Sequence, residues 1–280
     1  MGKALKRIGF VDYNLDNFHS NVYLRLLRNE LKGRGFKVIG GTGKRRKQSR
    51  VWAEENDVPY FNTVEDLNEA VDHYMILAPA NPETHLELCQ QVFPFGKATY
   101  VDKTFAPDLG IARRIFALAD RFGVPMQTTS ALRYTGVQDF VMDAGRVKHM
   151  VTWGGGRSFD EYAIHPLELA VSCMGPGVKR LMRRGRGKHT QLLLDFTGNR
   201  TATVNVYTQS RTPYAASVTT AGETTYLAVD GSRIFLDTAG AVLDLFETGK
   251  PAIDRKESLV IRRILDVAKQ KRALKGFVRL

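Results

Sequence analysis

Strand-like and helix-like segments alternate through the first 130 residues, and this alternation limits the possible folds more than any other feature. Residues 7–11, 36–40 and 74–78 are short apolar runs rich in β-favouring side chains, so they predict buried strands. Residues 98–101 and 125–128 predict two more. Because helix-like segments separate these runs, the repeated strand–helix–strand units predict a parallel sheet with right-handed crossovers.

The helices expected in this half have recognisable start signals. One is expected over residues 19–31. Thr63 begins another, with Asp66 at the spacing of a capping box. Asn81 is expected to cap the next helix, since Pro82 suits the first helical position. A further helix has apolar residues at helical spacing, namely Ile111, Ile115, Leu118 and Phe122.

The pattern changes near residue 130. Helices are expected at residues 134–143 and 166–173, and a basic amphipathic helix at 258–274. Short turns separate several β-rich segments, which favours an antiparallel sheet in an α/β chain. These expected strands cover residues 189–196, 200–207, 215–220, 224–229 and 233–236.

Composition indicates a soluble globular protein, with 43% hydrophobic and 25% charged residues. No apolar run approaches the roughly 20 residues that cross a bilayer, and the N-terminus has no signal-peptide core. Cys89 and Cys173 lie far apart in helix-like settings, so free thiols are expected rather than a disulfide or a metal pair. The expected location is therefore the cytoplasm, with no membrane segment and no metal.

The formal net charge is +12, with basic clusters at residues 44–47, 179–188 and 262–279. Such charge favours nucleic acid or a phosphorylated ligand, and the alternative is a set of solvated faces on a basic enzyme. No helix-turn-helix, zinc-finger or RNA-binding signature accompanies the charge. Nucleic acid is therefore not the partner that the sequence favours.

Three motifs occur in a recognisable order. They are Ala-Pro-Ala-Asn-Pro-Glu-Thr-His at residues 78–85, Val-Asp-Lys-Thr-Phe-Ala at 101–106 and Tyr-Ala-Ile-His-Pro-Leu-Glu-Leu at 162–169. Together they resemble the Gfo/Idh/MocA family of nicotinamide-dependent oxidoreductases over nearly the whole chain. The resemblance implies an N-terminal Rossmann-like dinucleotide-binding domain, residues 1–130. It also implies a C-terminal α/β domain, residues 131–280, with a mostly antiparallel open sheet for substrate binding and homo-oligomerisation, ending in a helix.

The resemblance also implies site residues. Lys103 stands where the family has the lysine of a Glu-Lys-Pro motif, at the carboxyl end of a strand where α/β sheets bind ligands. Alcohol oxidation needs a group that accepts the hydroxyl proton and a cation that stabilises the alkoxide. His165 matches the family's acid/base histidine, and Glu161 precedes it by four positions, completing the catalytic set. The implied substrate-binding residues are Lys103, Arg133, Tyr134, Tyr162 and His165. The implied cofactor-binding residues are Asp12, Asn14, Leu15, Thr42, Lys44, Arg45, Pro79, Asn81, His85, Asp102 and Lys103.

Structural alternatives exist for these residues. Lys103 can be a solvated strand-end charge, and His165 can cap the helix that Pro166 begins, with Glu168 stabilising its N-terminus. Arg133 can be a surface residue, Tyr134 and Tyr162 can be packing residues, and the triple glycine at residues 154–156 reads as a flexible turn.

The first β–α turn departs from the family. A dinucleotide fingerprint places glycines there so that backbone N–H groups approach the pyrophosphate, whereas Asp, Asn or larger residues occupy those positions here. Asp12 and Asp16 would repel a pyrophosphate beside them. The segment after the second strand lacks the acid that binds an adenosine ribose and carries cations at residues 44–46, so NADP is slightly favoured over NAD. A flexible basic loop is the alternative.

Three functional hypotheses follow. The first is an NAD(P)-dependent oxidoreductase that moves hydride to or from a sugar, cyclitol or related hydroxyl or carbonyl compound. The altered turn favours the second, a catalytically inactive relative that binds a sugar-like or phosphorylated ligand. The third, nucleic-acid binding, rests on charge alone.

Overall fold

The computed structural model describes residues 5–280, and these divide into two compact units. Unit 1 comprises residues 5–129 and 235–253, and unit 2 comprises residues 130–234 and 254–280. The expected domains were two consecutive segments that meet near residue 130. The structure does divide between Thr129 and Ser130, but residues 235–253 leave the second segment and belong to unit 1.

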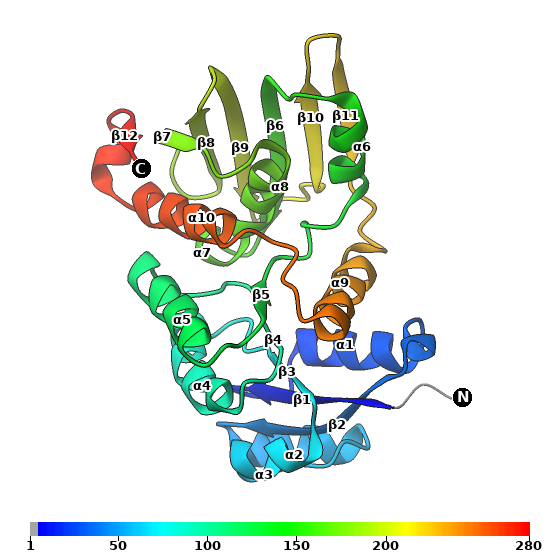
Figure 1. Cartoon of the computed structure of the whole chain (residues 1–280). Coiled ribbons are helices and arrows are strands. Elements are labelled where there is room, and N and C mark those ends of the chain that lie inside the picture. Colours follow the sequence, from blue (N-terminus) through cyan, green and yellow to red (C-terminus); the bar gives the residue numbers. More distant parts are fainter. Residues whose placement is uncertain (1–4) are drawn as a thin grey trace. The chain divides into compact units, whose positions relative to one another are not determined.

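Unit 1 is built on a five-stranded parallel sheet in the order β2-β1-β3-β4-β5 (Figure 1). The order shows that the chain crosses from β2 over β1 to β3 and then continues outward. This is the arrangement of a doubly wound dinucleotide-type sheet, which has a ligand-binding switch point beside β1. The strands are β1 (Lys6–Asp12), β2 (Phe36–Gly43), β3 (His73–Ile76), β4 (Thr99–Val101) and β5 (Met126–Thr128).

Helices follow the strands of unit 1 as the alternation predicts. Thr63 caps α3 by accepting the backbone N–H of Asp66, as expected from its sequence. Asn81 does not act as a side-chain cap, because Pro82 opens a 3-10 turn and the Asn81 amide donates to Glu83 instead. The elements are α1 (Phe18–Arg28), η1 (Lys32–Arg34), α2 (Arg46–Glu55), α3 (Val64–Ala70), η2 (Pro82–Thr84), α4 (His85–Val92), η3 (Phe93–Phe95) and α5 (Leu109–Arg121).

The strand expected at residues 233–236 is wrong, because those residues enter the helix α9 (Ile234–Thr248). Isolated from its context, Ile-Phe-Leu has the composition of a short strand, and periodicity cannot separate the two for so short a run. The buried residues downstream recur at helical spacing and join the core of unit 1 beside α1. There the ring centroids of Phe235 and Phe18 lie 5.5 Å apart. They are Ala239, Val242, Leu243 and Phe246.

Unit 2 contains a seven-stranded sheet in the order β11-β10-β6-β9-β8-β7-β12. Only β6 and β9 pair in parallel, so the sheet is mostly antiparallel, as the sequence predicts. The sequence did not identify β6, β7 or β12 as complete strands. The strands are β6 (His149–Gly156), β7 (Val178–Arg184), β8 (His189–Phe196), β9 (Arg200–Thr208), β10 (Ala215–Thr219), β11 (Thr224–Ala228) and β12 (Val278–Arg279).

The helices of unit 2 pack on one face of this sheet, and α8 and α10 lie together on it in Figure 1. The predicted C-terminal helix at residues 258–274 is present but begins earlier and ends in a separate 3-10 turn. The helical elements are α6 (Gly136–Ala144), α7 (Phe159–Tyr162), α8 (Ile164–Met174), α10 (Arg255–Ala268) and η4 (Lys271–Leu274).

The triple glycine is not a flexible turn, because all three residues lie in β6 and pair with β9. A Cβ at Gly155 would lie 1.8 Å from the carbonyl oxygen of Tyr207, and one at Gly156 would lie 2.2 Å from the ring of Tyr162. A Cβ at Gly154 would lie 2.9 Å from Pro166. The glycines therefore let β9 and the α7–α8 segment approach the strand closely.

We expect Gly155→Ala to destabilise the protein by roughly 2–4 kcal/mol, because its methyl group would meet the backbone of a paired strand rather than a movable side chain. Denaturant unfolding monitored by circular dichroism measures the change. Gly136→Ala is the control, since nothing lies within 4 Å of its Cβ and alanine favours a helix. Equal stability of both variants would contradict this account of β6.

Candidate functional site

The carboxyl ends of the parallel strands gather the expected cofactor residues at one edge of unit 1. Asp12 ends β1, Gly43 ends β2, and Asp102 and Lys103 follow β4. Pro79 lies shortly after β3, which pairs with both β1 and β4. Ligands of open α/β sheets bind outside such an edge, and the topology brings these candidates together there.

The turn that replaces the glycine fingerprint is held by its own polar side chains. Asp12 accepts hydrogen bonds from the backbone N–H of Asn14 (3.1 Å), from the Asn17 amide (2.8 Å) and from the Ser20 hydroxyl (3.2 Å). Asn17 also caps α1, because its Oδ1 accepts the N–H groups of His19 (2.9 Å) and Ser20 (3.1 Å). The first N–H groups of α1 are therefore bonded within the turn.

Asp12 is only 1% exposed, and burial raises its pKa to about 7. Hydrogen bonds from Asn17, Ser20 and the backbone N–H groups of Asn14 and Ala78 oppose this rise without cancelling it. A carboxyl group with this pKa is partly neutral near pH 7. It consequently opposes a nearby phosphate less than an ordinary aspartate would.

A pocket of about 250 Å³ opens beside this turn within unit 1. Asp12, Thr42 and Lys44 line it from the ends of β1 and β2, and Glu87 lines it from α4. The Lys44 ammonium lies 2.5 Å from the Glu87 carboxylate. The sequence showed no acid at the end of β2, but the fold brings one from α4 to the same pocket.

The two arginines that follow Lys44 have different positions. Arg46 lines the pocket, whereas the Arg45 guanidinium lies over the ring of Tyr13, 5.4 Å from its centroid. Arg45 Nε also donates to the Tyr13 hydroxyl at 3.3 Å. Leu15, another expected cofactor residue, has a fully buried side chain, and its N–H donates to Ser49. Arg46 is therefore the arginine that the pocket offers to a ligand.

Lys103 is held at its backbone by the side chain before it. Asp102 is 1% exposed and accepts the Lys103 N–H at 2.8 Å and the Tyr100 hydroxyl at 3.1 Å through one oxygen. Its other oxygen lies 2.5 Å from His19 Nδ1. The Lys103 ammonium lies 3.5 Å from the carbonyl oxygen of Pro79. The lysine thus joins the segments that follow β3 and β4.

His19 is a site residue that the sequence did not reveal. Burial alone would raise the pKa of Asp102, but His19, Lys103 and the hydrogen bonds together hold it below its ordinary value. His19 lies in the first turn of α1 and belongs to no recognised motif, so only the fold connects it with Asp102. The residues around His19, two positions after Asn17, form no pattern from which its contact with Asp102 could be predicted.

His85 is fully buried, which differs from the role expected for it. Its Nδ1 lies 2.9 Å from the carbonyl oxygen of Phe105, and its Nε2 lies near those of Leu77 (3.3 Å) and Ala78 (3.2 Å). Burial lowers its pKa. The imidazole therefore braces the segments after β3 and β4, and it has no exposed surface for a ligand.

Unit 2 places His165 in the first turn of α8 rather than at a cap, so the capping alternative is wrong. The ring is 8% exposed and lies between Tyr162 and Tyr214, 5.8 Å from each ring centroid. Tyr162 is half-buried and packs on Gly156. These residues form an aromatic cluster at the junction of α7 and α8.

The other expected residues of unit 2 serve packing and capping contacts. Glu161 lies in α7, where its N–H donates to Ser158 at 3.3 Å and its carboxylate accepts the Ser158 hydroxyl at 3.4 Å. Arg133 is not a surface residue, because its side chain is mostly buried in ion pairs with Glu257 and with Glu168, the latter at 3.6 Å. Tyr134 is half-buried just before α6.

Comparisons with known proteins were made on the sequence and on the structure. No protein-family model matches the chain. No curated protein matches it. Its fold, however, matches many solved structures.

Scyllo-inositol dehydrogenase from Lactobacillus casei shares 11% identity with a TM-score of 0.83, covering 100% of this chain and 99% of that one. Myo-inositol 2-dehydrogenase from Lactobacillus plantarum shares 13% identity with a TM-score of 0.79, covering 99% of both chains. GenD2 from gentamicin A biosynthesis, solved in complex with NAD, shares 14% identity with a TM-score of 0.80, covering 99% of this chain and 97% of that one. The chain therefore has the fold of these proteins.

No helix within residues 5–280 is both long enough and apolar enough to cross a membrane. No three acidic, histidine or cysteine side chains in that range gather as a metal site.

We expect the unfolding free energy to show the protonation of Asp12. Its folded pKa of about 7 exceeds the unfolded value of 3.8, so the folded state keeps a proton that the unfolded state has released between these values. The contribution of Asp12 to stability is thus present below about pH 4 and lost as pH rises through about 7. The unfolding free energy of Asp12→Asn should therefore increase relative to that of wild type as pH rises, by up to about 4 kcal/mol across this range.

Denaturant titrations at a series of pH values measure the difference between wild type and Asp12→Asn. Asp16→Asn is the matched control, because Asp16 is exposed in the same turn. A constant difference between wild type and Asp12→Asn across the range would contradict the assignment.

Proposed function

We propose that this chain is an NAD(P)-dependent oxidoreductase that transfers hydride to or from a sugar, cyclitol or related hydroxyl or carbonyl compound. The main support is the position of Lys103 at the carboxyl edge of the parallel sheet. The buried Asp102–His19 pair holds the lysine there through its backbone N–H. The likeness of the fold to dehydrogenases supports the same class. We assign dinucleotide binding to unit 1 and substrate binding to unit 2.

We propose that the residues at this edge hold a nicotinamide dinucleotide through contacts that differ from the usual pattern. The pocket beside Asp12 would take the adenosine ribose between Thr42, Lys44 and Glu87. The side-chain amide of Asn14 would supply a donor in place of the bare glycine N–H groups. The bound nicotinamide would supply the hydride acceptor or donor.

Lys103 would hold the reacting oxygen and stabilise its negative charge, as an ammonium group does best in a fixed position. Asp102 and His19 are positioning residues in this proposal, since they fix the backbone at Lys103. In unit 2, we propose that His165 exchanges the hydroxyl proton and that Tyr162 contacts the substrate. Arg133, Tyr134 and Glu161 would act through the packing of that unit.

One observation favours a second candidate, a non-catalytic relative that binds a sugar-like or phosphorylated ligand. The first-turn N–H groups of α1 are already bonded to Asn17, so the usual pyrophosphate contacts are occupied. Calorimetric titration with NADPH, NADP, NADH and NAD distinguishes the candidates. Binding of none of the four would eliminate the oxidoreductase proposal.

We expect Lys103→Met to lower kcat/KM by about 10²–10⁴-fold while the Kd for the dinucleotide changes little, because the lysine acts on developing charge. His165→Asn should lower kcat/KM by about 10²-fold or more. Dinucleotide oxidation or reduction with myo-inositol, scyllo-inositol and a panel of sugars measures both. Lys32→Met, an exposed lysine on η1, is the control. Full activity of Lys103→Met would refute the assigned role.

Cofactor preference depends on the Lys44–Glu87 pair in this proposal. Lys44 and Arg46 bring two cations to the pocket, whereas Glu87 brings one carboxylate and Asp12 a partly neutral carboxyl group, so a slight preference for NADP remains. Because Glu87 would repel a 2′-phosphate and can accept a hydrogen bond from a 2′-hydroxyl, Glu87→Gln should strengthen NADPH binding relative to NADH by about three- to tenfold. Parallel calorimetric titrations measure the ratio. Glu83→Gln, outside the pocket lining, is the control, and an unchanged ratio would count against Glu87.

We also propose self-association through the sheet of unit 2. Its strand register aligns half-buried Met182, Leu193 and Val151 with Tyr226, which is 60% exposed, on the face opposite α8. A stripe of this kind is typical of a protein interface.

The two free cysteines support a reducing compartment such as the cytoplasm.

We expect Leu193→Glu to reduce the molar mass in solution to that of a monomer, because a buried charge in the interface would be unpaired. Light scattering after size-exclusion chromatography measures the mass. Ala117→Glu, on the exposed side of α5, should leave it unchanged. A monomeric wild type would contradict the proposed self-association.

A further inference from the structure

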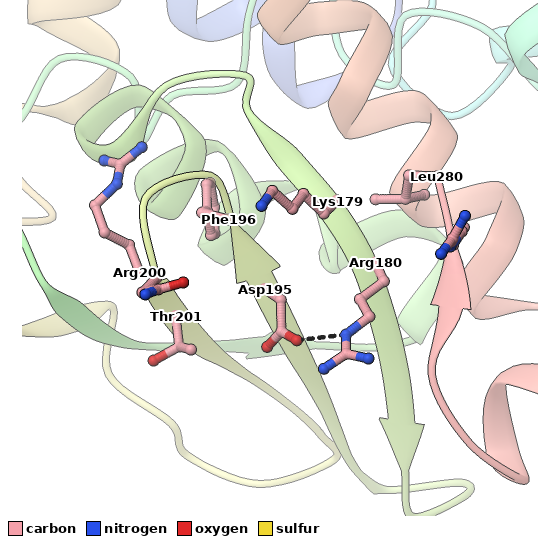
Figure 2. Close-up of a pocket in the computed structure, with 9 residues that line it drawn as sticks. Lys179, Arg180, Asp195, Phe196, Arg200, Thr201 and Leu280 are labelled. Atoms are coloured by element: carbon pink, nitrogen blue, oxygen red, sulfur yellow. Dashed lines mark hydrogen bonds and ion pairs between the residues drawn. The ribbon is translucent and has the colours of Figure 1, made fainter.

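A second cavity, which lies in unit 2, is strongly cationic. None of the residues that line it belongs to the site described above. It has a volume of about 760 Å³ and lies where β7, β8, β9 and β12 meet. Lys179 and Arg180 contribute from β7, Arg200 from β9 and Arg279 from β12, as Figure 2 shows for the labelled residues. The volume is in the range of cavities that bind small molecules.

The side-chain charges of this cationic groove are not balanced. Its lining contains four cations and one carboxylate, Asp195, and that carboxylate already accepts Arg180 Nε at 2.6 Å. Within residues 5–280, Lys179, Arg200 and Arg279 form no ion pair with a carboxylate. Three positive charges therefore face the groove without an acidic partner from the described chain.

Another cation, Arg146, lies beside the turn between β8 and β9 but does not line the groove. The Arg146 guanidinium lies so close to Gly198 that a Cβ there would be 2.2 Å from it, and Gly198 has a φ of 72° that suits glycine. Burial and then the charge of Arg146 lower the pKa of Arg200. The repulsion between these groups is a cost that a bound anion would relieve.

The backbone holds this cluster in place. Arg279 pairs with Arg180 across β12 and β7, and the N–H of Leu280 donates to the carbonyl oxygen of Lys179 at 3.0 Å. Arg200 opens β9 and donates from Nε to the carbonyl oxygen of Thr197 at 3.1 Å. The cations thus stand on paired strands and a tight turn, so the backbone beneath them needs little ordering when a ligand binds.

We propose that this groove binds a small phosphorylated ligand that carries at least two anionic groups. Guanidinium and ammonium groups from three strands match the several oxygens of a phosphate ester or polyphosphate. Single-stranded nucleic acid fits less well, since it needs exposed aromatic rings for base stacking. Phe196 in the floor is 2% exposed, and the exposed ring of Phe277 lies under Arg180.

The proposal is independent of the oxidoreductase assignment, because no residue of the groove belongs to the dinucleotide edge of unit 1. The test is calorimetric titration of the full chain with tripolyphosphate and with fructose 1,6-bisphosphate at low salt. The variant is Arg200→Gln/Arg279→Gln, which removes two unpaired cations. We expect wild type to bind at least one ligand and the variant to bind it about tenfold or more weakly.

Arg184→Gln/Lys275→Gln is the matched control, since it removes the same charge from exposed positions outside the groove lining. This control should change the affinity less than about threefold, and added salt should weaken binding to wild type. Both variants should keep the wild-type response to the nicotinamide dinucleotides, which separates this test from that of the proposed function. No binding to wild type, an equal loss in both double variants, or binding only of single-stranded nucleic acid would overturn the proposal.

Discussion

The buried contact between His19 and Asp102 is the interaction on which the candidate site depends. It joins the first turn of α1 to the end of β4, and the same carboxylate fixes the backbone of Lys103. A buried carboxylate without this partner would carry the full cost of desolvation, so the two side chains maintain each other. Tyr100 completes the arrangement through its hydroxyl.

The turn after β1 shows a different solution to the problem of a buried charge. Asp12 has polar donors but no cation among its hydrogen-bond partners, and its pKa accordingly rises where that of Asp102 falls. Asp12 ends β1 and Asp102 follows β4 at the same edge of the sheet, yet their surroundings shift their pKa values in opposite directions. A partly neutral Asp12 makes the glycine-poor turn more compatible with an anionic cofactor than its sequence suggests.

Several features could be predicted because their causes are local. The Thr63 cap and the β-rich runs of both units depend on neighbouring residues, and the structure contains them. The placement of Lys103 at a strand end also followed from pattern. The strand expected at residues 233–236 failed, because the helical α9 is selected by its packing in the core of unit 1 rather than by its first three residues.

The sequence by itself determined the alternation of strands and helices, the antiparallel character of the second sheet and the position of Lys103 after β4. Only the tertiary structure decided that Glu87 meets Lys44, that His19 meets Asp102 and that His85 is enclosed among carbonyl groups. It also decided that the triple glycine is a strand. Local patterns depend on residues a few positions apart, whereas these contacts join segments that approach only when the parallel sheet of unit 1 is assembled.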